Sequence, residues 1–274
     1  MKPFKMSGFF YEIKSIFFIQ LYCYCIFFYN FEIYSKFLTI EMKNTLLFMT
    51  LIIFSGFAFG QQREEKTFSV AVKQNIKKYN TLSSKAYESG DIEQGQFLFD
   101  TLVSNQLAGT KFEDYTLKKF SGGKLKLSAI KKPLMIQTYA SWCVINKGEI
   151  PALNKLARKY YKDLQIVVVF WDKKQAAKSL ASQFNGYIEV CYANENYKKD
   201  EAMVATLKYA IGFLTSYYLD ENLKVISIKK GTMAHTPKKT PLKEAIKQNF
   251  DIYNEALSSL LVKSDIKKEI LATH

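Results

Sequence analysis

The cysteine at position 143 is the side chain of this sequence best placed for chemistry. It follows a short apolar run at residues 134–139, introduced by Pro133, which is typical of a buried strand. After it, apolar residues recur at helical spacing, at Ile150, Leu153, Ala157 and Tyr160. We therefore expect Cys143 at a junction between a strand and a helix. The unpaired amides and the dipole at the start of a helix favour a thiolate, so this position predicts a reactive sulfur.

The residues around Cys143 resemble a known active-site segment. The pattern Ala-Ser-Trp-Cys-x-x-x-x-x-Glu-x-Pro is similar to that of the thioredoxin superfamily, and within it to the TlpA/ResA-like extracytoplasmic thiol-disulfide oxidoreductases. Their pattern is Trp-Cys-x-x-Cys, then a Glu three residues on and a Pro two after that. Trp142, Cys143, Glu149 and Pro151 fall in register, and the proline is expected to kink the helix. Asn146 stands in the place of the second cysteine.

Chemistry in this superfamily uses a nucleophilic thiol, a second thiol, a cis-proline loop and often a buried acid. The resemblance implies that Cys143 is the first and Glu149 the last, although Glu149 could also be a surface acid. Asn146 forms hydrogen bonds but cannot displace a disulfide sulfur. In the loop, Leu214 replaces the proline before Thr215. We expect a trans peptide there, because a non-proline cis bond costs about 2.5–4 kcal/mol.

Three hypotheses for function follow from these losses. The first is a degenerate oxidoreductase whose single thiol at Cys143 forms at most mixed disulfides. The second is a redox-inactive binding module that keeps Cys143 only for packing. The third is a working oxidoreductase that uses Cys191 as its resolving cysteine. Cys191 lies in the predicted strand 187–193, where a small buried apolar residue is its simplest role.

Residues 42–60 have the three parts of a secretory signal peptide. Lys43 supplies the basic start, an apolar run follows, and small residues precede cleavage before Gln61. Because such signals stand at N-termini, we expect translation to begin at Met42 and residues 1–41 to be a misassigned upstream extension. The alternative is a genuine N-terminal anchor followed by a second hydrophobic segment. Export predicts a periplasmic or secreted protein, where disulfides persist.

The rest of the chain divides into three predicted parts. Residues 61–108 carry two apolar stripes at helical spacing, broken at 89–91, and predict a helical hairpin. Residues 109–232 alternate strand and helix patterns, including a buried strand at 164–171, and predict a thioredoxin-like domain. Residues 233–274 predict a linker and a long amphipathic helix. The expected fold is therefore α/β, with a mixed central sheet flanked by helices.

The composition indicates which classes of partner this protein binds. The net charge is +14, but only Arg63 and Arg158 are arginines, and nucleic-acid interfaces rely on arginine. We expect a solvated lysine-rich surface and no nucleic-acid partner. His235 and His274 lie far from Cys143 and Cys191 in the sequence, so we expect no metal or other cofactor. The expected partner is a thiol-containing or disulfide-bonded client protein, with membrane contact only through the export signal.

Overall fold

The computed structural model describes residues 66–231, 237 and 239–272. The upstream extension and the signal peptide predicted from the sequence lie outside the described residues, as do both histidines. No helix in the described part of the chain is long and apolar enough to cross a membrane.

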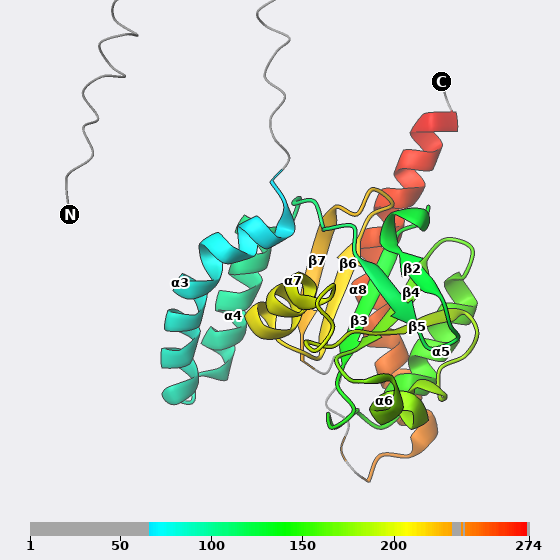
Figure 1. Cartoon of the computed structure of the whole chain (residues 1–274), viewed down its shortest axis with the longest axis horizontal. Helices are drawn as coiled ribbons and strands as arrows, with labels where there is room; N and C mark the ends of the chain where they lie inside the picture. The colour runs from blue at the N-terminus through cyan, green and yellow to red at the C-terminus, as the bar shows by residue number, and fades with distance from the viewer. Residues whose placement is uncertain (1–65, 232–236, 238, 273–274) are drawn as a thin grey trace, which may run out of the picture. The chain divides into compact units, whose positions relative to one another are not determined.

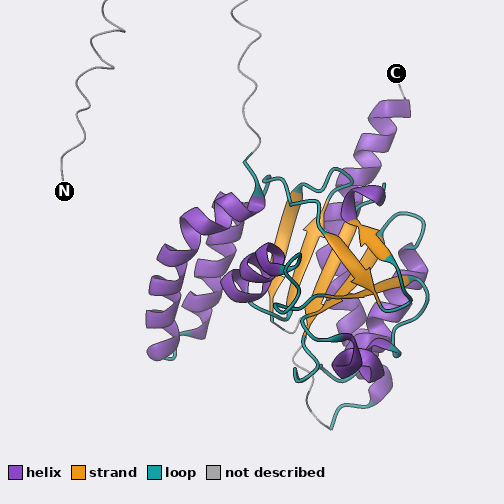
Figure 2. Ribbon diagram, viewed as in Figure 1, coloured by secondary structure: helices purple, strands orange, loops and turns teal. Residues whose placement is uncertain are grey.

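A seven-stranded mixed sheet forms the centre of the fold (Figure 2). Its order is β2-β1-β5-β4-β3-β6-β7, with β3 parallel to β4 and antiparallel to β6. All six residues of β3 are buried, as predicted from the short apolar run after Pro133. The strands are β1 Thr116–Lys119, β2 Lys124–Lys126, β3 Leu134–Tyr139, β4 Gln165–Phe170, β5 Ile188–Tyr192, β6 Thr215–Leu219 and β7 Val225–Lys230.

Helices cover both faces of this sheet (Figure 1). One face packs against α3 Phe68–Glu88, α4 Ile92–Leu102 and the π-helices η1 Val103–Leu107 and η3 Val204–Ile211, which follows α7 Glu201–Met203. The other face packs against α5 Glu149–Tyr160, α6 Lys174–Ala181 and α8 Leu242–Ala272. A short 3-10 helix, η2 Leu127–Ala129, follows β2.

Alternate side chains of the central strands supply the two cores. In β4, Val167 and Val169 pack on the α3 side, whereas Ile166, Val168 and Phe170 pack on the α5 side. Because successive side chains of a strand point to opposite faces, a strand covered on both faces needs an unbroken apolar run. The sequence prediction of a thioredoxin-like fold, with a mixed sheet flanked by helices and a long C-terminal helix, is confirmed.

The start of α5 differs from the prediction. Residues 140–148 form turns, and the helix begins only at Glu149, after Gly148 in a left-handed conformation with φ of 83°. Pro151 consequently lies in the first turn of the helix. Its missing N–H would have had no helical acceptor there, so the kink predicted from Pro151 has no cause.

Candidate functional site

Cys143 lies in the turn that follows the central strand β3. Its N–H donates to the carbonyl oxygen of Ala140 at 2.9 Å, and its side chain is half-buried. Burial raises the pKa of the Cys143 thiol, and the negative charge of Asp172 raises it further. The prediction that Cys143 faces the start of a helix is wrong, because α5 begins six residues later, at Glu149.

Asp172 follows β4 and holds the beginning of the Cys143 loop. The N–H of Ser141 donates to Asp172 Oδ2 at 2.7 Å, and Ser141 Oγ donates to Oδ1 at 2.8 Å. Sequence reasoning missed this carboxylate. The available signal was its place directly after a buried strand that is parallel to β3, because the carboxyl ends of parallel strands share one edge of the sheet.

Glu149 is the buried acid of the site, with 1% of its surface exposed. Its Oε1 accepts hydrogen bonds from the hydroxyls of Tyr139 at 2.7 Å and Tyr253 at 2.9 Å. Its Oε2 accepts the N–H of Asn146 at 3.2 Å. Burial and the nearby charge of Glu149 raise the pKa of both tyrosines well above the ordinary value, so both hydroxyls keep their protons and donate. Of the two alternatives for Glu149, the buried one is confirmed.

The loop before β6 lies beside the Cys143 loop. The Trp142 and Phe213 rings meet edge to face, with centroids 4.7 Å apart. Trp142 is 65% exposed and Val144 86% exposed, so apolar side chains flank the thiol on the surface. The structure thus places Trp142 against Phe213, the residue before Leu214.

Leu214 and Thr215 continue this loop into β6. Leu214 has a left-handed conformation, with φ of 58°, and the described residues contain no cis peptide bond. Its carbonyl oxygen accepts the N–H of Gly231 at 2.7 Å. The N–H of Thr215 donates to Thr138 Oγ1 at 3.0 Å, which in turn donates to the Thr215 carbonyl oxygen at 3.1 Å. These two hydrogen bonds join the start of β6 directly to β3.

Cys191 lies within β5, away from the surface. Its side chain is fully buried in the core on the α3 side of the sheet, and both Cys143 and Cys191 are free thiols. Burial raises the pKa of Cys191 to about 12, and the charge of Glu189 contributes. The prediction that Cys191 is a small buried residue of a strand is confirmed.

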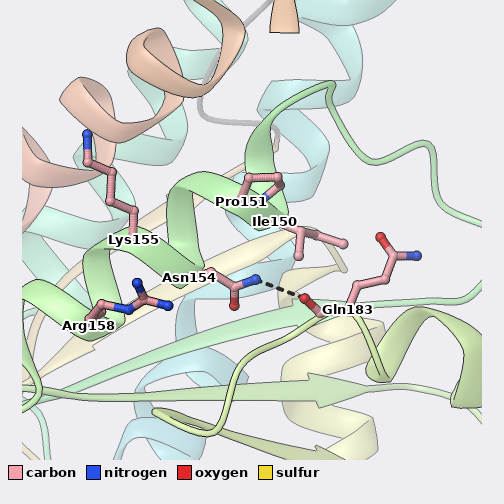
Figure 3. Close-up of a pocket in the computed structure, with 6 residues that line it drawn as sticks. All are labelled: Ile150, Pro151, Asn154, Lys155, Arg158 and Gln183. Atoms are coloured by element: carbon pink, nitrogen blue, oxygen red, sulfur yellow. Dashed lines mark hydrogen bonds between the residues drawn. The ribbon is translucent and has the colours of Figure 1, made fainter. Parts of the chain in front are cut away.

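A shallow hollow of about 360 Å³ lies along α5 (Figure 3). Asn154 Nδ2 crosses it to donate to the carbonyl oxygen of Gln183 at 2.8 Å. Cys143 is not among its lining residues, so the hollow belongs to the flank of α5. The lining residues are Ile150, Pro151, Asn154, Lys155, Arg158 and Gln183. In the described ranges, no three His, Cys, Asp or Glu side chains come together as metal ligands would.

No family model matches the chain. The chain is similar to the thioredoxin-like protein YneN of Bacillus subtilis, with 27% identity over 126 residues, which are 46% of this chain and 72% of that protein.

Similar solved structures include a thiol:disulfide interchange protein DsbE from Chlorobium tepidum, with 25% identity and a TM-score of 0.39 over 52% of this chain and 97% of that one. They also include the thioredoxin domain of a thiol-disulfide oxidoreductase from Bacteroides vulgatus, with 17% identity and a TM-score of 0.40 over 53% and 96%.

Proposed function

We propose that this protein is an exported, degenerate thiol-disulfide oxidoreductase of the TlpA/ResA-like type, whose single working thiol, Cys143, forms mixed disulfides with client proteins. The observation that carries the proposal is the position of Cys143. It is half-buried at the end of the central strand, beside exposed Trp142 and Val144, whereas the place of a second thiol is held by Asn146. The similarity to YneN supports the thioredoxin-like part of the proposal.

The proposed reaction is one half of thiol-disulfide exchange. Cys143 loses its proton to solvent, and the thiolate attacks one sulfur of a client disulfide. The client S–S bond breaks, a bond forms between the Cys143 sulfur and the attacked sulfur, and the second client sulfur leaves as a thiolate that takes up a proton. The raised pKa of Cys143 makes the thiolate scarce at neutral pH, so we expect the exchange to be slow.

The exchange stops at the mixed disulfide, because residues 66–272, as far as the structure describes them, offer no second thiol that can complete it. The Asn146 side chain can only hydrogen-bond. Cys191 is fully buried in the sheet, and its pKa of about 12 keeps it protonated. Release of the client therefore requires an external thiol. A working enzyme that uses Cys191 would have to expose a residue of β5.

A second candidate function is a redox-inactive binding module. Two observations favour it. The pKa of Cys143 is raised rather than lowered, and Trp142, Val144 and Phe213 form an exposed apolar surface around the thiol. In that case Cys143 serves packing, and the apolar surface holds a partner without covalent chemistry.

Export is supported by the signal-like pattern at residues 42–60. Mass spectrometry of the protein purified from cells that express the full sequence tests it. We expect an N-terminus at Gln61 and no peptide from residues 1–41. A peptide from that segment would contradict the proposed start at Met42.

The exchange is tested by incubating the purified protein with oxidised glutathione. Lys147 and Lys174 separate Cys143 from Cys191 in a tryptic digest, so each thiol is followed on its own peptide. We expect glutathione on the Cys143 peptide, none on the Cys191 peptide, and no catalytic reduction of insulin. A Cys143→Ser variant is the control. An unmodified Cys143 supports the binding module, whereas a Cys143–Cys191 disulfide with insulin turnover supports the working enzyme.

A further inference from the structure

We propose that the C-terminal helix α8 positions the loop that carries Cys143. It does so through Asn249, Tyr253 and the α8 backbone beside Gly148, and it thereby limits the access of a reacting partner to the thiol. The inference rests on the proposed function, because it concerns the same thiol.

Asn249 ties the end of the loop to α8. Its side chain is fully buried, and its Nδ2 donates to the carbonyl oxygen of Lys147 at 3.1 Å and to that of Ala245 at 2.8 Å. Lys147 Nζ reaches the carbonyl oxygen of Thr240, just before α8, at 2.8 Å. One loop residue is thus held at its backbone and at the tip of its side chain.

Gly148 brings the loop backbone against the helix backbone. A Cβ atom at this position would lie 2.7 Å from the carbonyl carbon of Ala245 and 2.7 Å from the nitrogen of Ile246. The residue also has φ of 83°, which side chains other than glycine rarely adopt. Only glycine allows the two segments to touch here without displacement.

Tyr253 joins the same loop through a shared carboxylate. Its hydroxyl donates to Glu149 Oε1, and the other oxygen of Glu149 accepts the N–H of Asn146. Asn146 is only three residues from Cys143 in the sequence. A hydroxyl on α8 and an amide of the loop are therefore joined through this carboxylate, which also accepts the hydroxyl of Tyr139 on β3.

These contacts make a loop with two anchors. Ser141 fixes its beginning to Asp172, and α8 fixes its end at Lys147 and Gly148. Cys143 lies between the anchors and is half-buried. Releasing the α8 anchor should let water reach the thiol while the Asp172 anchor stays, so the burial that disfavours the thiolate should decrease.

The test compares two asparagines of α8. Asn249→Ala removes the bond to the loop. Asn254→Ala is the matched control, because Asn254 Oδ1 accepts from Tyr160 Oη at 2.6 Å and from Lys159 Nζ at 3.3 Å, both at the far end of α5. The alkylation rate of Cys143 by iodoacetamide is measured between about pH 6 and pH 10 by peptide mass spectrometry of the purified protein.

We expect Asn249→Ala to shift the alkylation profile of Cys143 to lower pH and to raise the rate at pH 7 by about threefold, the gain in thiolate when the pKa falls by about half a unit. Asn254→Ala should leave the profile unchanged, although it also removes hydrogen bonds. Tyr253→Phe keeps the ring and removes only its hydroxyl, and it should shift the profile in the same direction. This variant tests the proposal even where Asn249→Ala fails to fold.

Identical profiles for the wild type, Asn249→Ala and Tyr253→Phe would overturn the positioning role. An equal shift in Asn254→Ala would also overturn it, by showing a general effect of loosening α8. Failure of the proposed function gives a different result. A Cys143 that takes up no glutathione can still be alkylated by iodoacetamide, so the pH profiles of its alkylation rate can still be compared between the variants.

Discussion

Tyr139 and Tyr218 are buried tyrosines on the neighbouring strands β3 and β6, with hydroxyls in opposite situations. The Tyr139 hydroxyl donates to Glu149 Oε1 at 2.7 Å. The Tyr218 hydroxyl has no hydrogen-bond partner within the described part of the chain. Replacement by Phe removes one oxygen from each and keeps the ring, so the two variants isolate the value of the hydrogen bond.

For Tyr139→Phe we expect the free energy of unfolding to fall by about 2 kcal/mol. The buried carboxylate of Glu149 accepts hydrogen bonds from Tyr139, Tyr253 and the Asn146 amide. A hydrogen bond to a charged group contributes about 1.5–3 kcal/mol. Tyr218→Phe removes a polar group whose burial is not compensated, so stability should be unchanged or rise by up to about 1 kcal/mol.

Urea unfolding at neutral pH, followed by far-ultraviolet circular dichroism, measures both changes. The double variant Tyr139→Phe with Glu149→Gln completes the comparison, because the loss at Tyr139 should shrink once the charge is removed. An equal loss of stability in Tyr139→Phe and Tyr218→Phe would refute the reasoning, since it would assign the effect to packing around the rings.

Asp172→Asn removes the charge that disfavours the Cys143 thiolate and keeps an acceptor for Ser141, so Cys143 alkylation at pH 7 should speed up by about threefold. Stability should fall above pH 9.0, where an unfolded Cys191 thiol begins to lose its proton while the folded thiol keeps it up to about pH 12. Cys191→Ala should flatten this loss in urea unfolding, by about 1.4 kcal/mol for each pH unit. Gly148→Ala should cost about 1–3 kcal/mol in the same assay, through strain and contact with α8. Gly122→Ala, where φ is 102° but the space is open, should cost less.

The sequence predicted those elements whose cause is local. The apolar runs of β3 and β4 identified buried strands, and at the break predicted at 89–91 the Asp91 side chain accepts the Gln94 N–H at 2.9 Å.

The surroundings of Cys143 could not be predicted in the same way. Periodicity placed apolar residues from Ile150 onward on a helix, but it did not show that α8 contacts Gly148 and that the helix begins only there. Asp172 and Tyr253 are remote from Cys143 in the sequence and reach the site through the sheet order and through helix packing. The direction of the Cys143 pKa shift depends on these tertiary contacts.

The bond between Tyr253 and Glu149 joins residues 104 positions apart, and Tyr253 belongs to the last helix of the chain. A ribosome therefore makes the strand, the thiol and the acid long before it makes the hydroxyl that covers the acid. Until Asn249 and Tyr253 have been made, the contacts between α8 and the Cys143 loop cannot form. The order of synthesis therefore makes the contacts with α8 later to form than the contact between Ser141 and Asp172.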